Sequence, residues 1–314
     1  MRERARFTWM NGQVLPSEQA VLSVTTEAVL RGANVFEGIR AYPRDGAQGL
    51  ALFRCADHLR RLHMSAKIMR MPIPYSDACL TKALGDLIQA NEFQLSTHLR
   101  LVCYFGDGPA YAYKSADITT GVFIVASEHG GLVVSQTGIR SCISTWRRNA
   151  DDASPSRVKA AGNYHNSRLA QVEADTKGFG TPIMLNSRGR IAESPSSCFM
   201  MVRDGALITP PVSADILEGI TRDAVMTLAR EVLGLTVVER EIDRTEVYIA
   251  DEAFFCGTGH EITPILSVDD YPIGDEQVGS VTHAIQSCYL DVVSGRLARW
   301  RHWLTPIIGF CASV

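Results

Sequence analysis

Hydrophobic residues recur at helical spacing in two segments of the N-terminal half. In the first segment, residues 57–71, the apolar positions lie three or four residues apart, as they do along one face of an α-helix: Leu59, Leu62, Ala66 and Met69. Asp57 is a suitable N-cap for this helix, and Pro72 would end it. The same spacing in residues 77–91 predicts a second helix.

Strand patterns surround these helices and extend through the rest of the chain. Residues 7–14 place the turn-forming pair Asn11 and Gly12 between two short apolar runs, which predicts a β-hairpin. Further strands are predicted at residues 99–105, 121–127, 138–145, 181–186, 198–203, 206–209 and 252–256, and further helices at residues 163–178, 221–233 and 278–293. Because strands and helices mix in both halves, the expected fold class is α/β or α+β.

The length of 314 residues suits two domains of roughly 150 residues each. We expect an N-terminal α+β domain over residues 1–127, an interdomain linker over residues 128–135, and a C-terminal domain over residues 136–314. The linker is placed at Gly130 and Gly131, which follow the last predicted strand of the first domain.

Charge and cysteine usage narrow the class of protein. With 31 basic and 34 acidic residues, the net charge of -3 creates no field that would attract nucleic acid or an anionic membrane. No apolar run approaches the roughly 20 residues that span a bilayer, and no apolar signal segment follows the charged N-terminus. The eight cysteines form no Cys-x-x-Cys pair, which is typical of free thiols in a reducing cytosol. We therefore expect a cytoplasmic protein without nucleic-acid or membrane partners.

Lys159 is the first candidate for chemistry. It lies in the segment SRVKAAGNY, residues 156–164, which contains Arg157 but no acidic residue. Apolar or cationic surroundings lower the pKa of a lysine and so favour the neutral amine that attacks a carbonyl group. On local sequence alone an ordinary surface lysine is the simpler interpretation, so Lys159 gains weight only from the features that follow it.

Those features occur in an order that suits pyridoxal 5'-phosphate. Tyr164 could reach a ring oxygen, and Glu193 could hold the pyridine nitrogen protonated, which strengthens the ring as an electron sink. The Gly-Ile-Thr turn at 219–221 opens a predicted helix whose N–H groups and positive end can bind phosphate, and a second Gly-Thr turn lies at 257–258. Taken singly, each feature has an ordinary alternative: a packed aromatic ring, a surface glutamate or a plain N-cap.

Other chemistries have less support in the sequence. The chain contains neither the Gly-x-x-x-x-Gly-Lys-Ser/Thr nor the strand-linked Gly-x-Gly-x-x-Gly signature of nucleotide sites. It has no Gly-x-Ser-x-Gly elbow of a serine hydrolase. His58 and His63 are five residues apart and would point to different sides of their helix, so no metal site is expected.

Four motifs resemble the branched-chain aminotransferases, which are class IV, or fold-type IV, pyridoxal-phosphate enzymes. They are VFEGIRAY at residues 35–42, HLRRLH at 58–63, KAAGNY at 159–164 and EITP at 261–264. The motifs occur in family order and at family spacing, and the similarity extends over nearly the whole chain. The resemblance implies a two-domain enzyme with its active site between the domains. It also implies a homodimer, and it leaves a higher oligomer open.

The resemblance further implies roles for individual residues. Lys159 would form the imine with the cofactor and later move the proton between the substrate α-carbon and the cofactor. The other residues implied to bind the cofactor are Arg60, Tyr164, Glu193, Leu217, Ile220, Thr221 and Thr258. The residues implied to lie at the substrate are Phe36, Gly38, Arg40 and Arg100, with the Thr258 and Gly259 amides at its α-carboxylate.

The substrate positions depart from the family pattern. At three positions where bacterial branched-chain enzymes usually have aromatic residues in the wall of the substrate pocket, this chain has basic residues: Arg31, His98 and His129. Leu132, Cys198 and His260 are further departures from the family pattern. A pocket for leucine, isoleucine or valine should be mostly apolar, because a buried unpaired charge is costly. The three basic residues could therefore bind a polar or anionic side chain, or they could pair with one another or with solvent.

We accordingly expect an enzyme that transfers the amino group of an L-amino acid, of the branched-chain type, to a 2-oxo acid such as 2-oxoglutarate. Alternatives within the same fold are an aminotransferase for a polar or unusual amino acid, a D-amino-acid or R-selective amine transaminase, and an aminodeoxychorismate lyase. A paralogue that binds cofactor or metabolite without turnover is the alternative from a different class.

Overall fold

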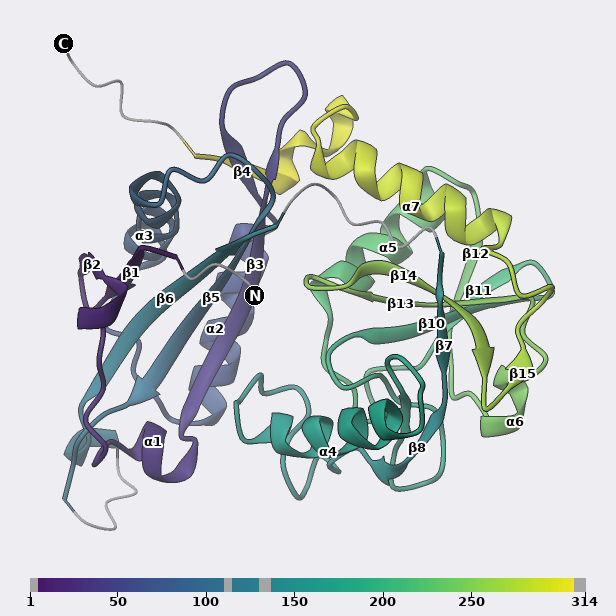
Figure 1. Ribbon diagram of the computed structural model, residues 1–314, viewed down its shortest axis with the longest axis horizontal. Helices are drawn as coiled ribbons and strands as arrows, with labels where there is room; N and C mark the ends of the chain where they lie inside the picture. The colour runs from purple at the N-terminus through teal and green to yellow at the C-terminus, as the bar shows by residue number, and fades with distance from the viewer. Residues whose placement is uncertain (1–4, 110–114, 130–136, 308–314) are drawn as a thin grey trace. The chain divides into compact units, whose positions relative to one another are not determined.

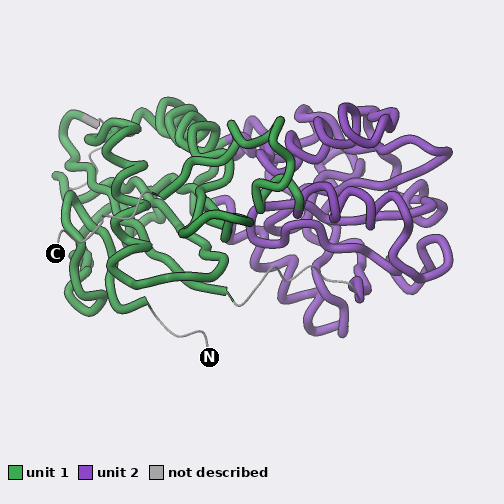
Figure 2. Tube along the Cα trace, turned by 90° about the horizontal axis from the view of Figure 1, so that it is seen from above, with its two compact units in different colours: residues 1–132, 158–162, 291–314 green, residues 133–157, 163–290 purple. Residues whose placement is uncertain are grey.

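A computed structural model describes residues 5–109, 115–129 and 137–307. The chain divides into two compact units (Figure 2). Unit 1 comprises residues 1–132, 158–162 and 291–314, and unit 2 comprises residues 133–157 and 163–290. Both units mix helices and strands, which confirms the expected α/β class. Most of the predicted linker, residues 130–135, lies outside the described residues, so the predicted domain limits stay a prediction.

The sheet of unit 1 is antiparallel, in the order β16-β4-β3-β5-β6-β1-β2 (Figure 1). Its strands are β1 (Phe7–Met10), β2 (Gln13–Pro16), β3 (Asn34–Pro43), β4 (Leu50–Phe53), β5 (Thr97–Phe105), β6 (Thr120–Glu128) and β16 (Leu304–Pro306). The predicted hairpin is confirmed as β1 and β2. Asn11 and Gly12 connect them with positive φ angles of 48° and 97°, the conformation that a tight hairpin turn requires.

Two helices pack on one face of this sheet, α2 (Cys55–Ile68) and α3 (Asp77–Ala90). Unit 1 also contains a short helix, α1 (Glu27–Arg31), and the 3-10 helices Ser17–Gln19, Ser115–Asp117 and Ala298–Trp303. The predicted N-cap of the first helix was wrong. Helix α2 begins at Cys55 after Arg54, whose φ of 52° is left-handed, and Asp57 lies in its first turn, where it pairs with the Arg54 side chain.

Strand alternation gives the unit 1 sheet two chemically different faces. Odd-numbered residues of β3 such as Val35 and Ile39 are fully buried in the core with apolar residues of α2 and α3. Even-numbered residues of β3 therefore project to the other face. These even positions include the three predicted substrate residues Phe36, Gly38 and Arg40.

Unit 2 is built around a sheet in the order β12-β11-β10-β13-β14-β15, with β7 paired to β14. The strands are β7 (Ile139–Ser141), β10 (Cys198–Arg203), β11 (Ala206–Thr209), β12 (Thr236–Glu239), β13 (Glu252–Gly257), β14 (Glu261–Val268) and β15 (Tyr271–Pro272). A separate parallel pair consists of β8 (Ile143–Arg147) and β9 (Ile183–Leu185). The single strand predicted at 138–145 is thus two strands, β7 and β8, in different sheets.

The helices of unit 2 are α4 (Asn163–Thr176), α5 (Ile220–Glu231) and α6 (Arg244–Val247), while α7 (Ser280–Val293) ends in unit 1. Of the helices that the structure describes, none has the length and apolar character needed to cross a membrane. All seven cysteines in the described ranges are free thiols, and six of them are buried. Cys79 on α3 is the exposed one, contrary to the pattern of the others.

Candidate active site

Lys159 lies in a short segment that hydrogen bonds attach to two elements of unit 1. Its N–H donates to Ser65 Oγ of α2 at 3.1 Å, and its carbonyl accepts from the N–H of Phe36 on β3 at 2.9 Å. The residues after Lys159 also pair with β3, because the Ala161 N–H donates to the Asn34 carbonyl at 3.2 Å. The backbone of Lys159 is therefore fixed to both the helix and the strand.

The Phe36 ring lies beside two cationic side chains. The ring is buried, with the Lys159 Nζ 4.9 Å and the Arg100 guanidinium carbon 3.9 Å from its centroid. Both distances lie within the range of cation–π attraction, which holds a cation over the electron-rich face of an aromatic ring. Three of the predicted site residues thus lie together on the face of the sheet away from the helices.

Strands β3 and β5 bring further predicted residues to the same face. Gly38 pairs with Arg100 and Arg40 pairs with His98 in the β3–β5 register. A Cβ atom on Gly38 would lie 3.0 Å from His98 Nε2, so glycine leaves room for the imidazole ring. Arg40 is buried, donates from Nε to Ser96 Oγ at 2.8 Å and lies over the Tyr42 ring.

The side chains that act electrostatically on His98 are all basic. Burial, followed by the charges of Arg40, His129, Arg100 and Lys159, lowers the pKa of His98 to about 4. His98 is therefore a neutral imidazole at neutral pH, able to donate one hydrogen bond and accept another. Around it, arginine and lysine give this face of the sheet a positive potential that suits an anionic group.

Behind this face lies a buried ion network that was not predicted from the sequence. Glu37 is fully buried between β3 and α2, and both its oxygens bind α2 side chains. Arg61 donates from Nε to Oε1 and from Nη2 to Oε2, each at 2.7 Å, and His58 Nδ1 lies 2.7 Å from Oε2. Burial alone would raise the pKa of Glu37, but Arg61 and then His58 bring it down to about 2.

The sequence did contain a signal for this network. Glu37 occupies an apolar-face position of β3, and His58 and Arg61 fall on the buried face of α2 beside Leu59 and Leu62. Charged residues at buried positions of two neighbouring elements indicate an internal pair. His63, by contrast, has a half-exposed side chain and lies 2.6 Å from an Asp77 oxygen, so the two histidines do face different surroundings.

Three predicted residues of unit 1 have local partners. Arg60 has a 70% exposed side chain and pairs with Asp57 at 2.7 Å. Arg31, at the end of α1, pairs with Glu27 one turn earlier. His129 Nε2 lies 3.4 Å from Ser127 Oγ.

In unit 2, Glu193 is a buried carboxylate with defined partners. Its Oε1 accepts from Arg148 Nη2 at 2.8 Å and from the Leu217 N–H at 3.2 Å. The two side chains of the ion pair are each only 6% exposed, so the arginine charge makes the buried anion tolerable. Leu217, predicted at the cofactor ring, is thereby connected to Glu193 through its backbone. Arg148 was not predicted.

The start of α5 follows Leu217, whose N–H is bonded to this carboxylate. Ile220 and Thr221 open the helix as buried residues, and the N-cap Gly219 has no side-chain cap bond. A Cβ atom on Gly219 would lie 2.7 Å from Cys198 Sγ, so the close approach requires glycine. The Cys198 thiol also lies 3.8 Å from the Leu217 carbonyl, which connects β10 to the segment before α5.

The turn between β13 and β14 contains Thr258 and Gly259. It lies against the turn after Glu193: a Cβ atom added at Gly257 would be only 3.1 Å from Ser197 Cβ. Ser196 Oγ and His260 Nε2 are 3.0 Å apart across the two turns. Burial lowers the pKa of His260, which favours its neutral form.

Tyr164 is the second residue of α4 and is half-buried. The helix begins at Asn163, whose side chain donates to the Pro155 carbonyl at 3.1 Å and accepts from Ser154. These bonds fix the entry to α4 and with it the position of Tyr164 within unit 2.

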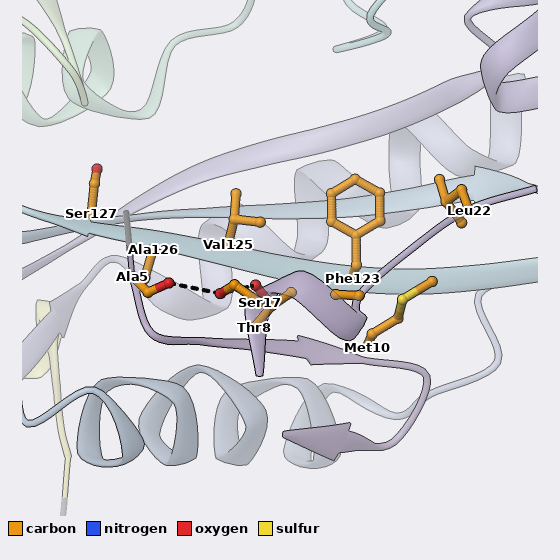
Figure 3. Close-up of a pocket in the computed structure, with 10 residues that line it drawn as sticks. Ala5, Thr8, Met10, Ser17, Leu22, Phe123, Val125, Ala126 and Ser127 are labelled. Atoms are coloured by element: carbon orange, nitrogen blue, oxygen red, sulfur yellow. Dashed lines mark hydrogen bonds between the residues drawn. The ribbon is translucent and has the colours of Figure 1, made fainter. Parts of the chain in front are cut away.

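A cavity of about 420 Å³ lies in unit 1 between the N-terminal segment and β6 (Figure 3). Two of its lining residues, Val125 and Ser127, are the cross-strand partners of Arg100 and His98. Its wall is mostly apolar and includes Met10, Leu22, Phe123 and Val125. Ser17 Oγ closes one side by donating to the Ala5 carbonyl at 2.7 Å. None of the predicted site residues lines it.

Comparison with known proteins gives a consistent set of relatives. The family model described as amino-transferase class IV matches residues 34–268. The branched-chain-amino-acid aminotransferases of Escherichia coli K12 and Pseudomonas aeruginosa are 37% and 38% identical, over 97% and 98% of this chain and 98% and 99% of theirs.

Solved structures agree with the sequence relatives. The branched-chain amino acid aminotransferase of Thermobaculum terrenum in its PLP-form matches with a TM-score of 0.92 and 39% identity, covering 98% of this chain and 100% of that chain. The branched-chain aminotransferase of Thermoproteus uzoniensis with norvaline matches with a TM-score of 0.90 and 37% identity, covering 96% and 99%.

Proposed function

This chain belongs to the class IV aminotransferases, and on that premise we propose that it is a branched-chain-amino-acid aminotransferase. It would move the amino group of L-leucine, L-isoleucine or L-valine to a 2-oxo acid such as 2-oxoglutarate. The observation that supports this best is the end-to-end match to relatives named for that activity.

The cofactor is pyridoxal 5'-phosphate, as in the PLP-form of the Thermobaculum terrenum relative. The residues present fit it. The start of α5 offers backbone N–H groups without a side-chain cap, which suits a phosphate. The Glu193 carboxylate is held by Arg148 and the Leu217 N–H, which suits a protonated ring nitrogen.

Each proposed residue has a distinct role. When bound, the cofactor supplies an electron sink for the bonds of the substrate α-carbon. Lys159 would take and return the proton at that carbon, and Glu193 would keep a proton at the pyridine nitrogen. Arg60, Ile220, Thr221 and Thr258 would bind the phosphate, Tyr164 the ring oxygen, and Leu217 the ring face.

Each predicted substrate residue would also have a distinct role. Phe36, Gly38 and Arg40 would line its side chain, Arg100 would attract an acidic side chain of the acceptor, and the Thr258 and Gly259 amides would bind its α-carboxylate. The basic side chains around His98 create a positive potential. This potential would attract the second carboxylate of an acceptor such as 2-oxoglutarate, so Arg100 suits that acceptor.

The polar departures do not demand a polar amino donor. Arg31 pairs with Glu27, and His129 lies beside Ser127, so both basic groups have partners within the chain. His98 is neutral, which removes the cost of a charged imidazole beside an apolar side chain. These contacts favour the branched-chain donor over a polar one, and the names of the relatives favour it over the D-amino-acid and amine alternatives.

Cellular setting and assembly complete the proposal. We place the enzyme in the cytoplasm, since its described cysteines are free thiols, as expected in a reducing compartment. We also propose a homodimer, because the family resemblance implies one. Light scattering after size-exclusion chromatography would test it, and a monomer at micromolar concentration would contradict it.

The test of function is the absorbance spectrum of the protein loaded with pyridoxal 5'-phosphate. L-leucine, L-isoleucine and L-valine should each remove the visible band, and 2-oxoglutarate should restore it. L-arginine and D-alanine serve as controls that should leave it unchanged. A response to only the polar or D-amino acid would overturn the substrate assignment and keep the cofactor.

A further inference from the structure

Two turns of unit 2 lie against each other at the residues proposed for the substrate α-carboxylate. One turn, residues 257–260, connects β13 to β14 and contains Thr258 and Gly259. The other turn, residues 194–197, follows Glu193. Ser196 Oγ of the second turn lies 3.0 Å from His260 Nε2 of the first, which makes a hydrogen bond between side chains 64 positions apart.

The 194–197 turn is fixed by bonds of its own. Glu193 and Cys198 pair as in an antiparallel hairpin, and the Ser194 N–H donates to the Ser197 carbonyl at 2.8 Å. Ser194 Oγ accepts from the Ser196 N–H at 3.2 Å and from the Ser197 N–H at 2.8 Å. A serine hydroxyl that binds backbone N–H groups two and three residues later stabilises a tight turn. The position of Ser196 is therefore set without help from His260.

The 257–260 turn is held at its ends and open at its tip. The His260 N–H donates to the Gly257 carbonyl at 3.2 Å, and the His260 carbonyl accepts from Thr263 Oγ1 at 2.9 Å. At the tip, Gly259 is exposed, and a Cβ atom added there would contact no described residue within 4 Å. Because glycine has the widest choice of backbone angles, the orientation of the Gly259 amide depends on the residues that flank it.

We propose that His260 and Ser196 are positioning residues whose hydrogen bond holds the 257–260 turn, so that the Thr258 and Gly259 amides stay in place for the substrate α-carboxylate. This inference rests on the proposed function, which assigns those two amides to the carboxylate. It goes further by giving a role to two side chains that the proposed function does not use, and by naming the 194–197 turn as the support.

The chemistry of the pair suits this role. A neutral imidazole has one donor and one acceptor nitrogen, and a hydroxyl can complement either, so the bond forms in both tautomers of His260. Burial lowers the pKa of His260 and so favours this neutral ring, which contributes position rather than charge. His260 is a position at which this chain departs from the family pattern, and an alanine there would have no polar atom to reach Ser196.

The first test uses cofactor-free protein, so that it does not depend on catalysis. The exchange rate of the His260 amide, whose bond to Gly257 closes the turn, is compared in wild type and Ser196→Ala. Loss of the hydrogen bond between the turns should speed this exchange about three- to tenfold. Unchanged exchange would overturn the positioning role.

The reverse substitution tests which turn is the support. In His260→Ala the Ser196 amide should keep its wild-type exchange rate, because Ser194 Oγ still accepts its hydrogen bond. Faster exchange of the Ser196 amide in this variant would show that the 194–197 turn needs His260, and would overturn its assignment as the support.

The second test measures how the loaded enzyme binds a bare carboxylate. The probe is 4-methylpentanoate, which has the carbon chain of leucine without its amino group, and calorimetry gives the dissociation constant. Ser196→Ala and His260→Ala should each raise this constant about three- to tenfold. They should raise KM for L-leucine and 2-oxoglutarate by a similar factor and leave kcat within about twofold, because the α-carboxylate is bound in the ground and transition states alike. A lower kcat with unchanged KM would indicate loss of folded enzyme and would overturn the positioning role.

A double-mutant cycle shows whether the hydrogen bond is the cause. The variant with both substitutions should bind 4-methylpentanoate no more weakly than either single variant, since each removes the same bond. His260→Gln can place its amide near the position of Nε2 and should recover most of the binding. Additive losses, or a glutamine variant as weak as His260→Ala, would overturn the hydrogen bond as the cause.

Matched controls come from α7. His283 and Ser287 are an exposed histidine and an exposed serine four positions apart on this helix. His283→Ala, Ser287→Ala and their combination should leave the exchange of the His260 amide and the binding of 4-methylpentanoate unchanged. Effects at His260 and Ser196 no larger than those of the controls would overturn the proposal.

The positioning role and the proposed function fail in different ways. If wild type neither converts L-leucine nor binds 4-methylpentanoate while the exchange results hold, the proposed function fails and the bond from Ser196 to His260 remains the hold on its turn. If wild type transaminates L-leucine and the variants match their controls, the proposed function stands and the positioning role fails.

Discussion

The surroundings of Lys159 in unit 1 and of Glu193 in unit 2 hold their key residues in different ways. Around Lys159, a strand and a long helix are joined by buried side chains with two formal charges and a titratable histidine. Around Glu193, turns at strand ends approach closely through glycine and serine, and Arg148 forms an ion pair with the carboxylate. The first arrangement can respond to pH, whereas the second depends mainly on shape.

The largest expected effect comes from removing the amine itself. Lys159→Ala should lower transamination of L-leucine by about 10³-fold or more, because Lys159 is the group proposed to move the α-proton. Steady-state kinetics measures it, with circular dichroism as a check of folding. Lys159→Arg is the matched control that keeps a positive charge and should be equally inactive. Activity within tenfold of wild type in Lys159→Ala would remove Lys159 from the mechanism.

Removing one arginine from each region should show that the two stability penalties depend differently on pH. Arg148→Met leaves the Glu193 anion buried without its cation and should cost about 3–5 kcal/mol of unfolding free energy, measured by urea titration. Arg61→Met should cost a similar amount at pH 8. At pH 5.5 it should cost less, because loss of the Arg61 charge raises the pKa of His58 and the imidazolium can replace the guanidinium beside Glu37.

The direction of this pH dependence follows from proton uptake on folding. We predict that the folded pKa of His58 rises in Arg61→Met, because one of the charges that lower it is removed; if it rises above the unfolded value, the compensation is present below the unfolded pKa and disappears as pH rises through the folded one. Arg148 bonds to Glu193 and Ser167, and neither of these side chains can become a cation. Equal pH dependence of the two penalties would contradict this contrast.

Two glycines test the dependence on shape. Gly219→Ala would place a Cβ 2.7 Å from Cys198 Sγ and should cost about 1–3 kcal/mol of stability. Gly38→Ala would place a Cβ 3.0 Å from His98 Nε2 and should cost less, because the end of an imidazole ring can move away. Thermal unfolding compares the two.

The double variants Gly219→Ala with Cys198→Ala and Gly38→Ala with His98→Ala should recover most of each loss, since each removes the clashing atom. Gly259→Ala is the open-space control, because nothing lies within 4 Å of its new Cβ. A penalty for Gly219→Ala no greater than for Gly259→Ala would show that the close approach to Cys198 is unimportant.

The smallest expected effect is a pH dependence from His98. Its folded pKa of about 4 lies below the ordinary value of 6.5, so the folded state binds fewer protons than the unfolded state between these values. The associated stability is fully present above pH 6.5 and is lost as pH falls towards 4. Wild type should lose up to about 2 kcal/mol more than His98→Gln across this window, by urea titration at each pH. Parallel curves would contradict a neutral His98 in the folded state.

Much of the fold was predictable from local patterns. The hairpin at Asn11 and Gly12, the helix at 77–90 and the strands at 198–203 and 206–209 follow from turn chemistry and side-chain periodicity. Strands β3, β4, β12, β14, β15 and β16 were not predicted from the pattern. Strand β3 is buried on both faces, so it has no polar–apolar alternation. The others are short, edge-like or interrupted by proline, so their conformation depends on pairing with neighbours.

The candidate site likewise contains residues that local sequence predicts and residues that it does not. Lys159, Glu193 and the Gly-Ile-Thr turn before α5 were recognisable because each residue type suits its chemistry within a local segment. Ser65, Arg61 and Arg148 were missed because their roles depend on residues 94, 24 and 45 positions away in the chain. Sequence separation of that size leaves no local periodicity to detect.

The amino-acid sequence by itself determined the fold class and the candidate chemistry: a two-unit α/β chain with a candidate amine, Lys159, a candidate carboxylate, Glu193, and a candidate phosphate turn before α5. Only the tertiary structure decided which face of β3 holds Phe36 and which buries Glu37, and which arginine pairs with each carboxylate. The physical reason is that composition and spacing specify what a residue can do, whereas burial and long-range contact set its charge, orientation and partners.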